Sequence, residues 1–397
     1  MYWFLLGRER LLSAAEISAV LDYKNIEFTD GSPILRCSAD VADPNLLMAR
    51  LGGTIKIGVE IATQLTENEL LTAAAAALAP VEGKINFGIS LYDPNNNTAP
   101  RQQAGQIGTW GKQIKQGLKT SGRSVRHVFN YEPILSSVTV TINKLCGRGV
   151  EFLIYKKGNK YDLARTVAVQ PFEEFSERDF GRPGRDDLSG MLPPKLAMMM
   201  INIAGAKPSD TILDPFCGSG TIITEAMLMG YKNLIGSDIS EKAITDTKTN
   251  VEWTSSRCHP ERSEGSSPNN IQLFQSDIAQ IGNKLKLNSV DAIIAEPYLG
   301  KPLKGNETRA ELQKQTLELK NLYLDAFQEF TKILKPNGTV VFLVPRFRAG
   351  NDWIIIDIKN DIKKIGFTPD ELLPGREALL YARANQRVGR EVWKFTR

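Results

Sequence analysis

Residues 214–220, Asp-Pro-Phe-Cys-Gly-Ser-Gly, join an apolar predicted strand to a predicted helix. Glycines between a strand and a helix let the backbone approach a nucleotide-like ligand closely. Within residues 201–231 the only Lys or Arg is Lys207, which precedes the strand. The Asp214 carboxylate would repel a pyrophosphate but suits a cationic ligand such as the sulfonium of S-adenosylmethionine. The predicted contacts of the donor's methionine part are Asp214, Phe216, Gly218 and Gly220.

Two further aspartates follow apolar segments that we expect to be the next strands of the same sheet. Asp238 closes the segment 233–238, and Asp277 follows the segment 271–276. A strand-end acid after a glycine-rich turn binds ribose hydroxyls in nucleotide sites, so we assign the ribose to Asp238 and the adenine to Asp277. Alternatively, each aspartate is only the N-cap of the following helix. The predicted site includes the residue after each acid, Ile239 and Ile278.

The residue pattern divides the chain of 397 residues into parts. Residues 1–60 and 61–170 each mix strand and helix signals, which indicates small α+β units. Residues 171–193 are rich in Arg, Asp, Gly and Pro, and we predict a linker. Strands alternate with helices over 194–397, as is typical of a parallel α/β sheet covered by helices on both faces.

Several elements are predicted within these parts. The segment 137–145 is predicted to be a strand and 352–365 a helix, and 378–383 with 390–396 should form an antiparallel hairpin. Residues 253–270 are predicted to be an exposed polar insertion. The insertion holds Cys258 and His259, but we do not assign a metal there.

Composition excludes several classes of protein. The four cysteines include no Cys-x-x-Cys pair, and there are only two histidines, so we expect no metal site, disulfide framework or histidine triad. No segment is apolar enough to span a bilayer and the N-terminus lacks signal-peptide features. We therefore expect a cytoplasmic protein without membrane contact.

A basic segment points to a polyanionic partner. Residues 101–148 contain eight Lys and Arg but one acid, although the net charge of the whole chain is only +4. On a helix over 107–119, the lysines fall on a stripe separate from the apolar face. We favour contact with RNA phosphates over a merely solvated face. The predicted RNA-binding residues are Lys112, Lys115, Lys119, Arg123 and Arg126. A second group, Arg383, Arg387 and Arg390, is left open as a further contact.

The acids at successive strand ends resemble those of class I S-adenosylmethionine-dependent methyltransferases. Together with 214–220, the segments 178–185 (Arg-Asp-Phe-Gly-Arg-Pro-Gly-Arg) and 191–195 (Met-Leu-Pro-Pro-Lys) resemble the THUMP-domain tRNA guanosine methyltransferases. Those enzymes methylate the exocyclic amine of guanosine ten in tRNA. The resemblance implies a seven-stranded Rossmann-like methyltransferase domain at 194–397, with a mostly parallel sheet. It further implies a ferredoxin-like domain at 1–60, a THUMP RNA-binding domain at 61–170, S-adenosylmethionine as cofactor and tRNA as partner.

The same resemblance implies roles for two more groups of residues. The start of the helix after the linker borders the donor in this family, which implies supporting roles for Leu192, Pro193 and Lys195. The family carries Asp/Asn-Pro-Pro-Tyr/Phe after the fourth strand, where this chain has Ala295-Glu-Pro-Tyr298. The implied catalytic residues are Glu296, Pro297 and Tyr298.

Methylation of an exocyclic amine explains why these residue types are needed. The nitrogen lone pair is delocalised into the ring, so acceptors must pull the N–H groups until the nitrogen faces the methyl group. The Glu296 carboxylate and the Pro297 carbonyl would accept these hydrogens, while Tyr298 stacks on the extruded base. Because Ala295 replaces the family's acid, Glu296 either restores the hydrogen bond from its shifted position or points away.

Three alternatives remain open at the level of sequence. The chain could methylate ribosomal RNA or the adenine amino group in DNA, because the acceptor chemistry is shared. It could also be a catalytically silent RNA-binding protein that retains a donor pocket. The modified nucleotide, mono- versus dimethylation, oligomeric state and a small activator subunit are not specified.

Overall fold

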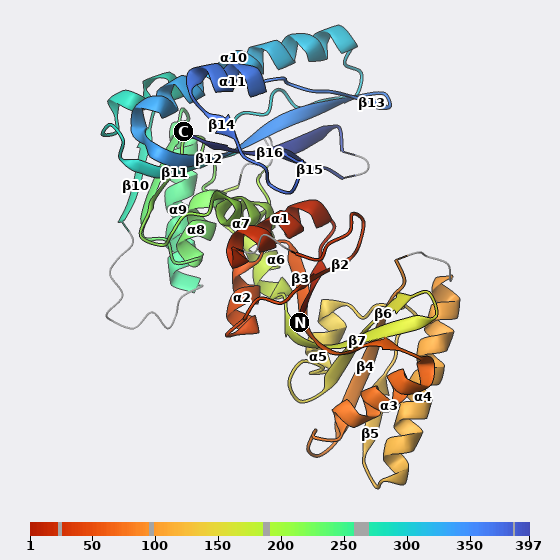
Figure 1. Ribbon diagram of the computed structural model, residues 1–397. Helices are drawn as coiled ribbons and strands as arrows, with labels where there is room; N and C mark the ends of the chain where they lie inside the picture. The colour runs from red at the N-terminus through yellow and green to blue at the C-terminus, as the bar shows by residue number, and fades with distance from the viewer. Residues whose placement is uncertain (23–25, 95–98, 186–190, 258–269, 384–385) are drawn as a thin grey trace. The chain divides into compact units, whose positions relative to one another are not determined.

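The computed structural model describes residues 1–22, 26–94, 99–185, 191–257, 270–383 and 386–397 (Figure 1). It divides into two compact units, an N-terminal unit of residues 1–14 and 23–173 and a C-terminal unit of residues 15–22 and 174–397. The pair Cys258 and His259 and most of the predicted insertion lie outside the described residues.

The N-terminal unit is built on a seven-stranded mixed sheet with the order β2-β1-β3-β7-β6-β4-β5. Strand β4 runs parallel to β5 and β6, and the remaining pairs are antiparallel. The sheet passes without interruption from β3 to β7, so residues 1–60 and 61–170 share one sheet. The strands are β1 (Tyr2–Leu6), β2 (Ile34–Cys37), β3 (Thr54–Leu65), β4 (Ile85–Tyr92), β5 (Val125–Val128), β6 (Val150–Lys157) and β7 (Lys160–Val169).

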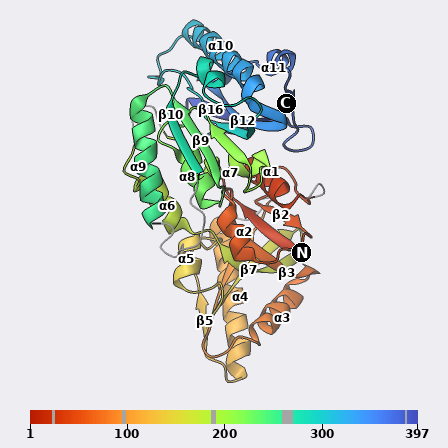
Figure 2. The same ribbon diagram turned by 90° about the vertical axis from the view of Figure 1, so that its left-hand side faces the viewer.

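Helices α3 and α4 pack against each other and cover this sheet (Figure 2). Helix α4 buries Ile107, Trp110 and Ile114 against the strands, which confirms the predicted apolar face. A capping box at Thr66 fixes the start of α3. The helices of the unit are α1 (Arg10–Leu21, shared with the C-terminal unit), α2 (Pro44–Arg50), α3 (Glu67–Leu78), α4 (Pro100–Thr120) and α5 (Ser137–Ile142).

The predicted strand over 137–145 is wrong, because residues 137–142 form helix α5. The β-branched residues of Ser-Val-Thr-Val-Thr-Ile favour a strand by propensity. The side chain of Ser136, however, accepts a hydrogen bond from the backbone N–H of Thr139 at 3.1 Å and so caps a helix. Burial of Val140 then fixes this turn against the sheet.

The C-terminal unit contains the predicted α/β sheet. Its main path has the order β10-β9-β8-β11-β12-β16-β14, and β13 and β15 pair with β12 and β16. Strands β8 to β12 are parallel, and the predicted hairpin is confirmed as β15 paired antiparallel with β16. The strands are β8 (Thr211–Asp214), β9 (Asn233–Asp238), β10 (Asn270–Gln275), β11 (Val290–Ala295), β12 (Leu334–Ala349), β13 (Asp352–Ile354), β14 (Thr368–Pro369), β15 (Ala378–Tyr381) and β16 (Val388–Thr396).

Two sets of helices cover opposite faces of this sheet, as expected for strands buried on both sides (Figure 1). Helix α8 packs between α7 and α9, and α10 packs on η1 and α11. The second set encloses a core rich in aromatic rings around Phe327 and Phe342. The helices are α6 (Phe172–Phe180), α7 (Pro194–Ala204), α8 (Thr221–Leu228), α9 (Glu241–Arg257), the 3₁₀ helix η1 (Ile278–Asn283), α10 (Arg309–Ile333) and α11 (Lys359–Ile365).

Three predicted elements of this region need correction. The predicted linker 171–193 contains helix α6, whose buried Phe175 and Arg178 lie on one face. The predicted helix 352–365 begins as strand β13, which pairs with β12, and only its last part is helical. Helix α9 continues to Arg257, so the predicted insertion starts later than expected. Among the described residues, no helix has the length and apolar character needed to cross a membrane.

Candidate donor and acceptor site

The carboxyl ends of adjacent parallel strands bring the predicted acids to one edge of the C-terminal sheet. In the order β10-β9-β8-β11, Asp277 follows β10, Asp238 ends β9, Asp214 ends β8 and Glu296 follows β11. Asp214 pairs with Gly236 across the β8–β9 ladder, and Asp238 pairs with Gln275. This edge is where open α/β sheets bind their ligands.

The loop between β8 and α8 depends on two glycines with positive φ. Gly218 has φ 52° and Gly220, which precedes α8, has φ 82°. A β-carbon on Gly220 would lie 2.7 Å from Cγ2 of Thr247 on α9, so the loop also needs the small residue for space. The Thr247 hydroxyl donates to the Gly218 carbonyl at 2.8 Å. Helix α9 therefore holds the loop tightly in place.

The Asp238 carboxylate is held by two backbone N–H groups, one from the glycine loop and one from the turn after β9. One carboxylate oxygen accepts from Gly218 N at 2.9 Å and the other from Ser240 N at 2.9 Å. A carboxylate oxygen has two lone pairs, so each oxygen retains an acceptor position for a hydroxyl. The geometry fits the predicted ribose contact and links this acid directly to the glycine loop.

Asp214 is the buried acid of the group, with a relative exposure of 2%. Burial raises its pKa well above the usual range, and the nearby carboxylates of Asp238 and Glu296 raise it further, although the N–H of Phe216 donates to it at 3.1 Å. Negative charge is therefore costly here unless a cation is bound. The sulfonium and amino groups of a methyl donor would supply such a cation.

The adenine end of the predicted site is less specific. Asp277 accepts from the N–H of Ala279 at 3.0 Å and is the N-cap of η1, which is the structural alternative raised by the sequence. Ile278 is buried in the core, whereas Ile239 is 67% exposed. The exposed Ile239 is the apolar side chain here that a base could cover.

The predicted supporting residues lie at the start of α7. Leu192 is buried, and Pro193 is the N-cap residue of α7. The ammonium of Lys195 lies 5.0 Å from the centre of the Phe175 ring on α6. This cation–π contact ties the start of α7 to α6 and gives Lys195 a structural role.

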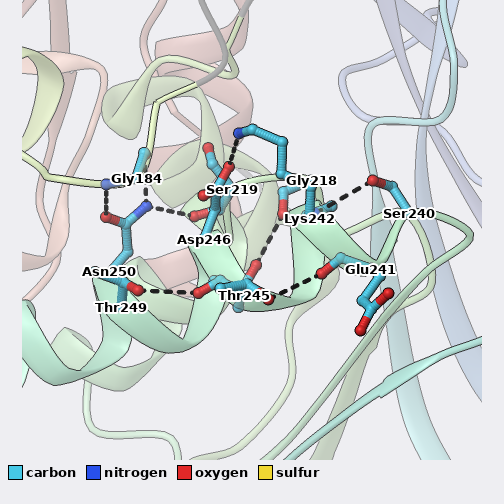
Figure 3. Close-up of polar contacts among 12 residues, drawn as sticks. Gly184, Gly218, Ser219, Ser240, Glu241, Lys242, Thr245, Asp246, Thr249 and Asn250 are labelled. Carbon is cyan, nitrogen blue, oxygen red and sulfur yellow. Dashed lines mark hydrogen bonds and ion pairs between the residues drawn. The ribbon is translucent and has the colours of Figure 1, made fainter.

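A polar network that the sequence did not reveal connects the segment 178–185 with the glycine loop (Figure 3). The side chain of Asn250 on α9 exchanges two hydrogen bonds of 2.8 Å with the backbone of Gly184 and donates to the Ser219 carbonyl at 2.7 Å. Arg182 donates to the Thr221 hydroxyl at 2.5 Å. The segment is part of the support of the donor loop, and a buried asparagine on a predicted polar helix gave no signal of it.

The acceptor residues follow β11. The side chain of Glu296 accepts from Nε of Arg390 at 2.5 Å, which shows where the shifted carboxylate points. Pro297 is buried, and the ring of Tyr298 is 53% exposed. The Tyr298 carbonyl accepts from the buried hydroxyl of Tyr323 at 2.8 Å, so the loop is fixed while the ring is free to stack.

The predicted RNA-binding residues lie in the N-terminal unit. Lys112 and Lys119 are exposed on α4 and Lys115 is half-buried, and Arg126 is exposed on β5. The guanidinium of Arg123 instead donates to carbonyls at the end of α3, Ala79 at 3.1 Å and Val81. Its contacts indicate a structural role for Arg123.

Two exposed aromatic rings near this stripe were missed by the sequence analysis. Phe129 is 42% exposed and Tyr131 84% exposed, and their rings are 5.6 Å apart at 71°. Phe129 lies against α4, close to Gly108. Exposed rings beside cations are typical of surfaces on which RNA bases stack.

Comparison with known families matches part of the chain to methyltransferases. Residues 182–353 match the model described as the RMKL-like methyltransferase domain. Residues 107–249 match a second model, described as DNA methylase. The first match covers β8 to β12 together with the candidate donor and acceptor loops.

Several curated relatives are named as tRNA methyltransferases, and each is matched over part of its length. The chain is 32% identical to the tRNA (guanine(10)-N2)-dimethyltransferase of Methanothermobacter thermautotrophicus over 145 residues, 36% of this chain and 37% of the relative. It is 28% identical to the enzyme of that name from Methanocaldococcus jannaschii, over 46% of this chain and 48% of the relative. The tRNA (guanine(6)-N2)-methyltransferase of Thermus thermophilus is 29% identical over 40% of this chain and 41% of the relative. The match thus spans less than half the length of these relatives.

A solved structure of a Thermus thermophilus protein is similar to this one over the whole chain. The crystal structure of TrmN from Thermus thermophilus covers 100% of both chains with a TM-score of 0.54 and 19% identity. At this identity the likeness concerns the fold. The expected Rossmann-like methyltransferase fold is therefore confirmed, and residues 182–353 are similar to the RMKL-like methyltransferase domain.

Proposed function

We propose that the protein transfers a methyl group from S-adenosylmethionine to the exocyclic amine of a guanosine in tRNA. The observation that carries this proposal is the gathering of Asp214, Asp238 and Glu296 at the carboxyl edge of one sheet, beside a glycine loop and the exposed ring of Tyr298. The methyltransferase-domain match and the names of the curated relatives support it.

The donor would bind with its charge beside Asp214 and its ribose on Asp238. The buried carboxyl of Asp214 matches the sulfonium, and the anchored carboxylate of Asp238 keeps acceptor positions for the ribose hydroxyls. Because Gly218 and Gly220 have no side chains, the donor can approach the loop backbone closely. Phe216 packs in the core against Phe342 and forms an apolar wall of the site.

The target amine would then be oriented by Glu296 and the Pro297 carbonyl, with the base stacked on Tyr298. These acceptors draw the N–H groups away from the ring plane, so that the nitrogen lone pair faces the methyl group. The donor would supply the methyl group to the amine nitrogen as its C–S bond breaks, and the Glu296 carboxylate would accept the proton that the amine releases. Stacking contributes about 1–3 kcal/mol, which offsets much of the cost of extruding the base.

The N-terminal unit would bind the RNA. Lys112, Lys115, Lys119 and Arg126 supply phosphate contacts, with Phe129 and Tyr131 beside them as stacking rings. The division of this unit into a ferredoxin-like part (1–60) and a THUMP part (61–170) belongs to the same proposal. A cytoplasmic location belongs to the same proposal.

Guanosine ten is the proposed target because two of the relatives carry that position in their names. Another relative is named for guanosine six, so the experiment must map the nucleotide. The DNA methylase match over residues 107–249 keeps DNA adenine as a second candidate.

The test is incubation of purified protein with labelled S-adenosylmethionine and unmodified tRNA, ribosomal RNA or DNA, followed by nucleoside analysis. N2-methylguanosine from tRNA alone is expected, and mapping locates the nucleotide. Glu296→Gln should lower transfer about 100-fold or more while the affinity for S-adenosylhomocysteine stays the same. Asp238→Ala should weaken that affinity without changing tRNA binding.

Two outcomes would contradict the proposal. Binding of both ligands without any product would favour the silent RNA-binding protein. Methyladenine from DNA would replace the RNA substrate by the alternative one.

A further inference from the structure

The contact between Glu296 and Arg390 suggests how the acceptor site selects its base. Arg390 lies near the start of β16, opposite Pro345 of β12, at the edge of the sheet where β11 ends. Its Nε donates to Oε1 of Glu296 at 2.5 Å, and the two side chains are only 13% and 16% exposed. An ion pair with so little exposure is held in a defined geometry.

The pair presents an acceptor and a donor side by side. The contact occupies one N–H of a planar guanidinium whose other N–H groups lie in the same plane. It also occupies one lone pair of a carboxylate that has further acceptor positions on both oxygens. Along the edge of a ligand that binds this pair, the carboxylate oxygens therefore lie next to the guanidinium N–H groups, so two acceptors are followed by a donor.

The Watson–Crick edge of guanine has the complementary order. It presents the N2 amine and N1–H as donors, followed by O6 as an acceptor. Adenine presents an amine donor at the other end and the acceptor N1 in the middle, which a carboxylate would repel. In cytosine, too, an acceptor lies next to the amine, and a carboxylate would repel it.

We propose that Glu296 and Arg390 together read guanine, with the carboxylate on N2–H and N1–H and the Arg390 guanidinium on O6. This inference rests on the proposed function and adds Arg390 as a residue that determines specificity. Glu296 follows β11, the strand beside β8, and Asp214 ends β8, so the N2 amine would lie at the sheet edge that carries Asp214. The base is then held by one edge and, through Tyr298, by one face.

This role differs from the phosphate contact considered for Arg390 in the sequence analysis. A guanidinium already neutralised by Glu296 attracts a phosphate weakly, and its limited exposure keeps it from a backbone that passes outside. A base that inserts edge-on would contact the exposed parts of both side chains. Arg390 is therefore assigned to the base.

The experiment replaces one atom of the substrate. A tRNA with 6-thioguanosine at the mapped target keeps the N2 amine and N1–H but exchanges O6 for sulfur, a weak acceptor. For the wild-type protein, kcat/KM should fall about 10-fold or more on this substrate, since a hydrogen bond from a charged donor is lost. Arg390→Lys keeps the positive charge but not the planar fork. For this variant, the ratio of kcat/KM on the guanosine substrate to kcat/KM on the 6-thioguanosine substrate should approach one.

A matched control is available on the same pair of strands. Arg346 on β12 forms an ion pair with Glu391 of β16, and residues 390 and 391 point to opposite faces of the sheet. Arg346→Lys should keep the wild-type ratio. Because each ratio compares two substrates on one preparation, it does not depend on how much of a variant folds.

The outcomes separate this inference from the proposed function. If the wild-type protein makes N2-methylguanosine and Arg390→Lys keeps the wild-type ratio, the role of Arg390 is refuted and the function stands. If the wild-type protein uses guanosine and 6-thioguanosine substrates with nearly equal kcat/KM, the role of Arg390 is refuted in the same way. If the wild-type protein methylates no guanosine in any RNA, the proposed function fails and the inference fails with it.

Discussion

Substitution of Gly220 by alanine should destabilise the C-terminal unit for two separable reasons. The first is backbone conformation, since φ at Gly220 is 82° and an L-residue in the left-handed region costs about 1–2 kcal/mol. The second is space, because the new β-carbon would lie 2.7 Å from Cγ2 and 2.9 Å from Oγ1 of Thr247. Overpacking of this kind costs about 1–3 kcal/mol. The free energy of unfolding should therefore fall by about 2–5 kcal/mol.

Gly218→Ala is the matched control in the same loop. Gly218 also has a positive φ, 52°, but among the described residues no atom beyond its chain neighbours lies within 4 Å of the position that a β-carbon would take there. Only the backbone cost of about 1–2 kcal/mol applies to it. The difference between the two variants therefore measures the contact with Thr247.

A third variant isolates the clash. Thr247→Ser removes Cγ2 but keeps the hydroxyl that donates to the Gly218 carbonyl. In the double variant with Gly220→Ala, about 1 kcal/mol or more of the lost stability should return. Unfolding in urea, monitored by hydrogen exchange of peptides from β8 to α9, reports the stability of this unit directly.

Two results would refute this reasoning. One is a Gly220→Ala variant that is no less stable than Gly218→Ala. The other is a double variant in which the two substitutions simply add. Either would mean that the loop moves away from α9 at little cost, and the tight donor loop would then be an incorrect description.

Two further predictions concern the N-terminal unit. Burial, with a smaller contribution from Lys115, lowers the pKa of His127 from 6.5 to about 4, so the unfolded chain binds a proton that the folded unit excludes. The free energy of unfolding should therefore fall by up to about 2–3 kcal/mol as the pH decreases from 6.5 to 4. Equal pH profiles for the wild type and His127→Gln in denaturant titrations would contradict this. Replacement of Lys112, Lys115 and Lys119 by glutamine should flatten the slope of log affinity against log salt for tRNA by about 2–3; parallel slopes would remove these lysines from the interface.

The sequence predicted those parts of the fold that depend on local patterns. Alternating apolar segments located β8 to β12, and the acids that follow them lie at one edge because parallel strands end together. The helix over 137–142 was not predicted, because β-branched side chains favour strands unless a cap such as Ser136 and burial of Val140 decide otherwise. Helix α6 was hidden by its charged composition, which its contacts with the core offset.

The site was predictable to the same extent. The glycine loop and the acids are adjacent in sequence to the strands that carry them, so their positions followed from the strands. The partner of Glu296 did not, because Arg390 is 94 residues away and two strands across the sheet. Asn250 likewise meets Gly184 only after the chain has folded. Pairings of this kind depend on tertiary structure and leave no periodic signal.

The buried carboxyl of Asp214 has a consequence for turnover. A group that ionises readily only beside a cation distinguishes the two forms of the cofactor, because the sulfur loses its charge when the methyl group leaves. The spent cofactor would keep only the positive charge of its amino group, so Asp214 would favour its neutral, protonated state more strongly and would hold the spent cofactor less firmly than the fresh one. Exchange of used for new cofactor would thus be accompanied by loss of a proton from the same side chain.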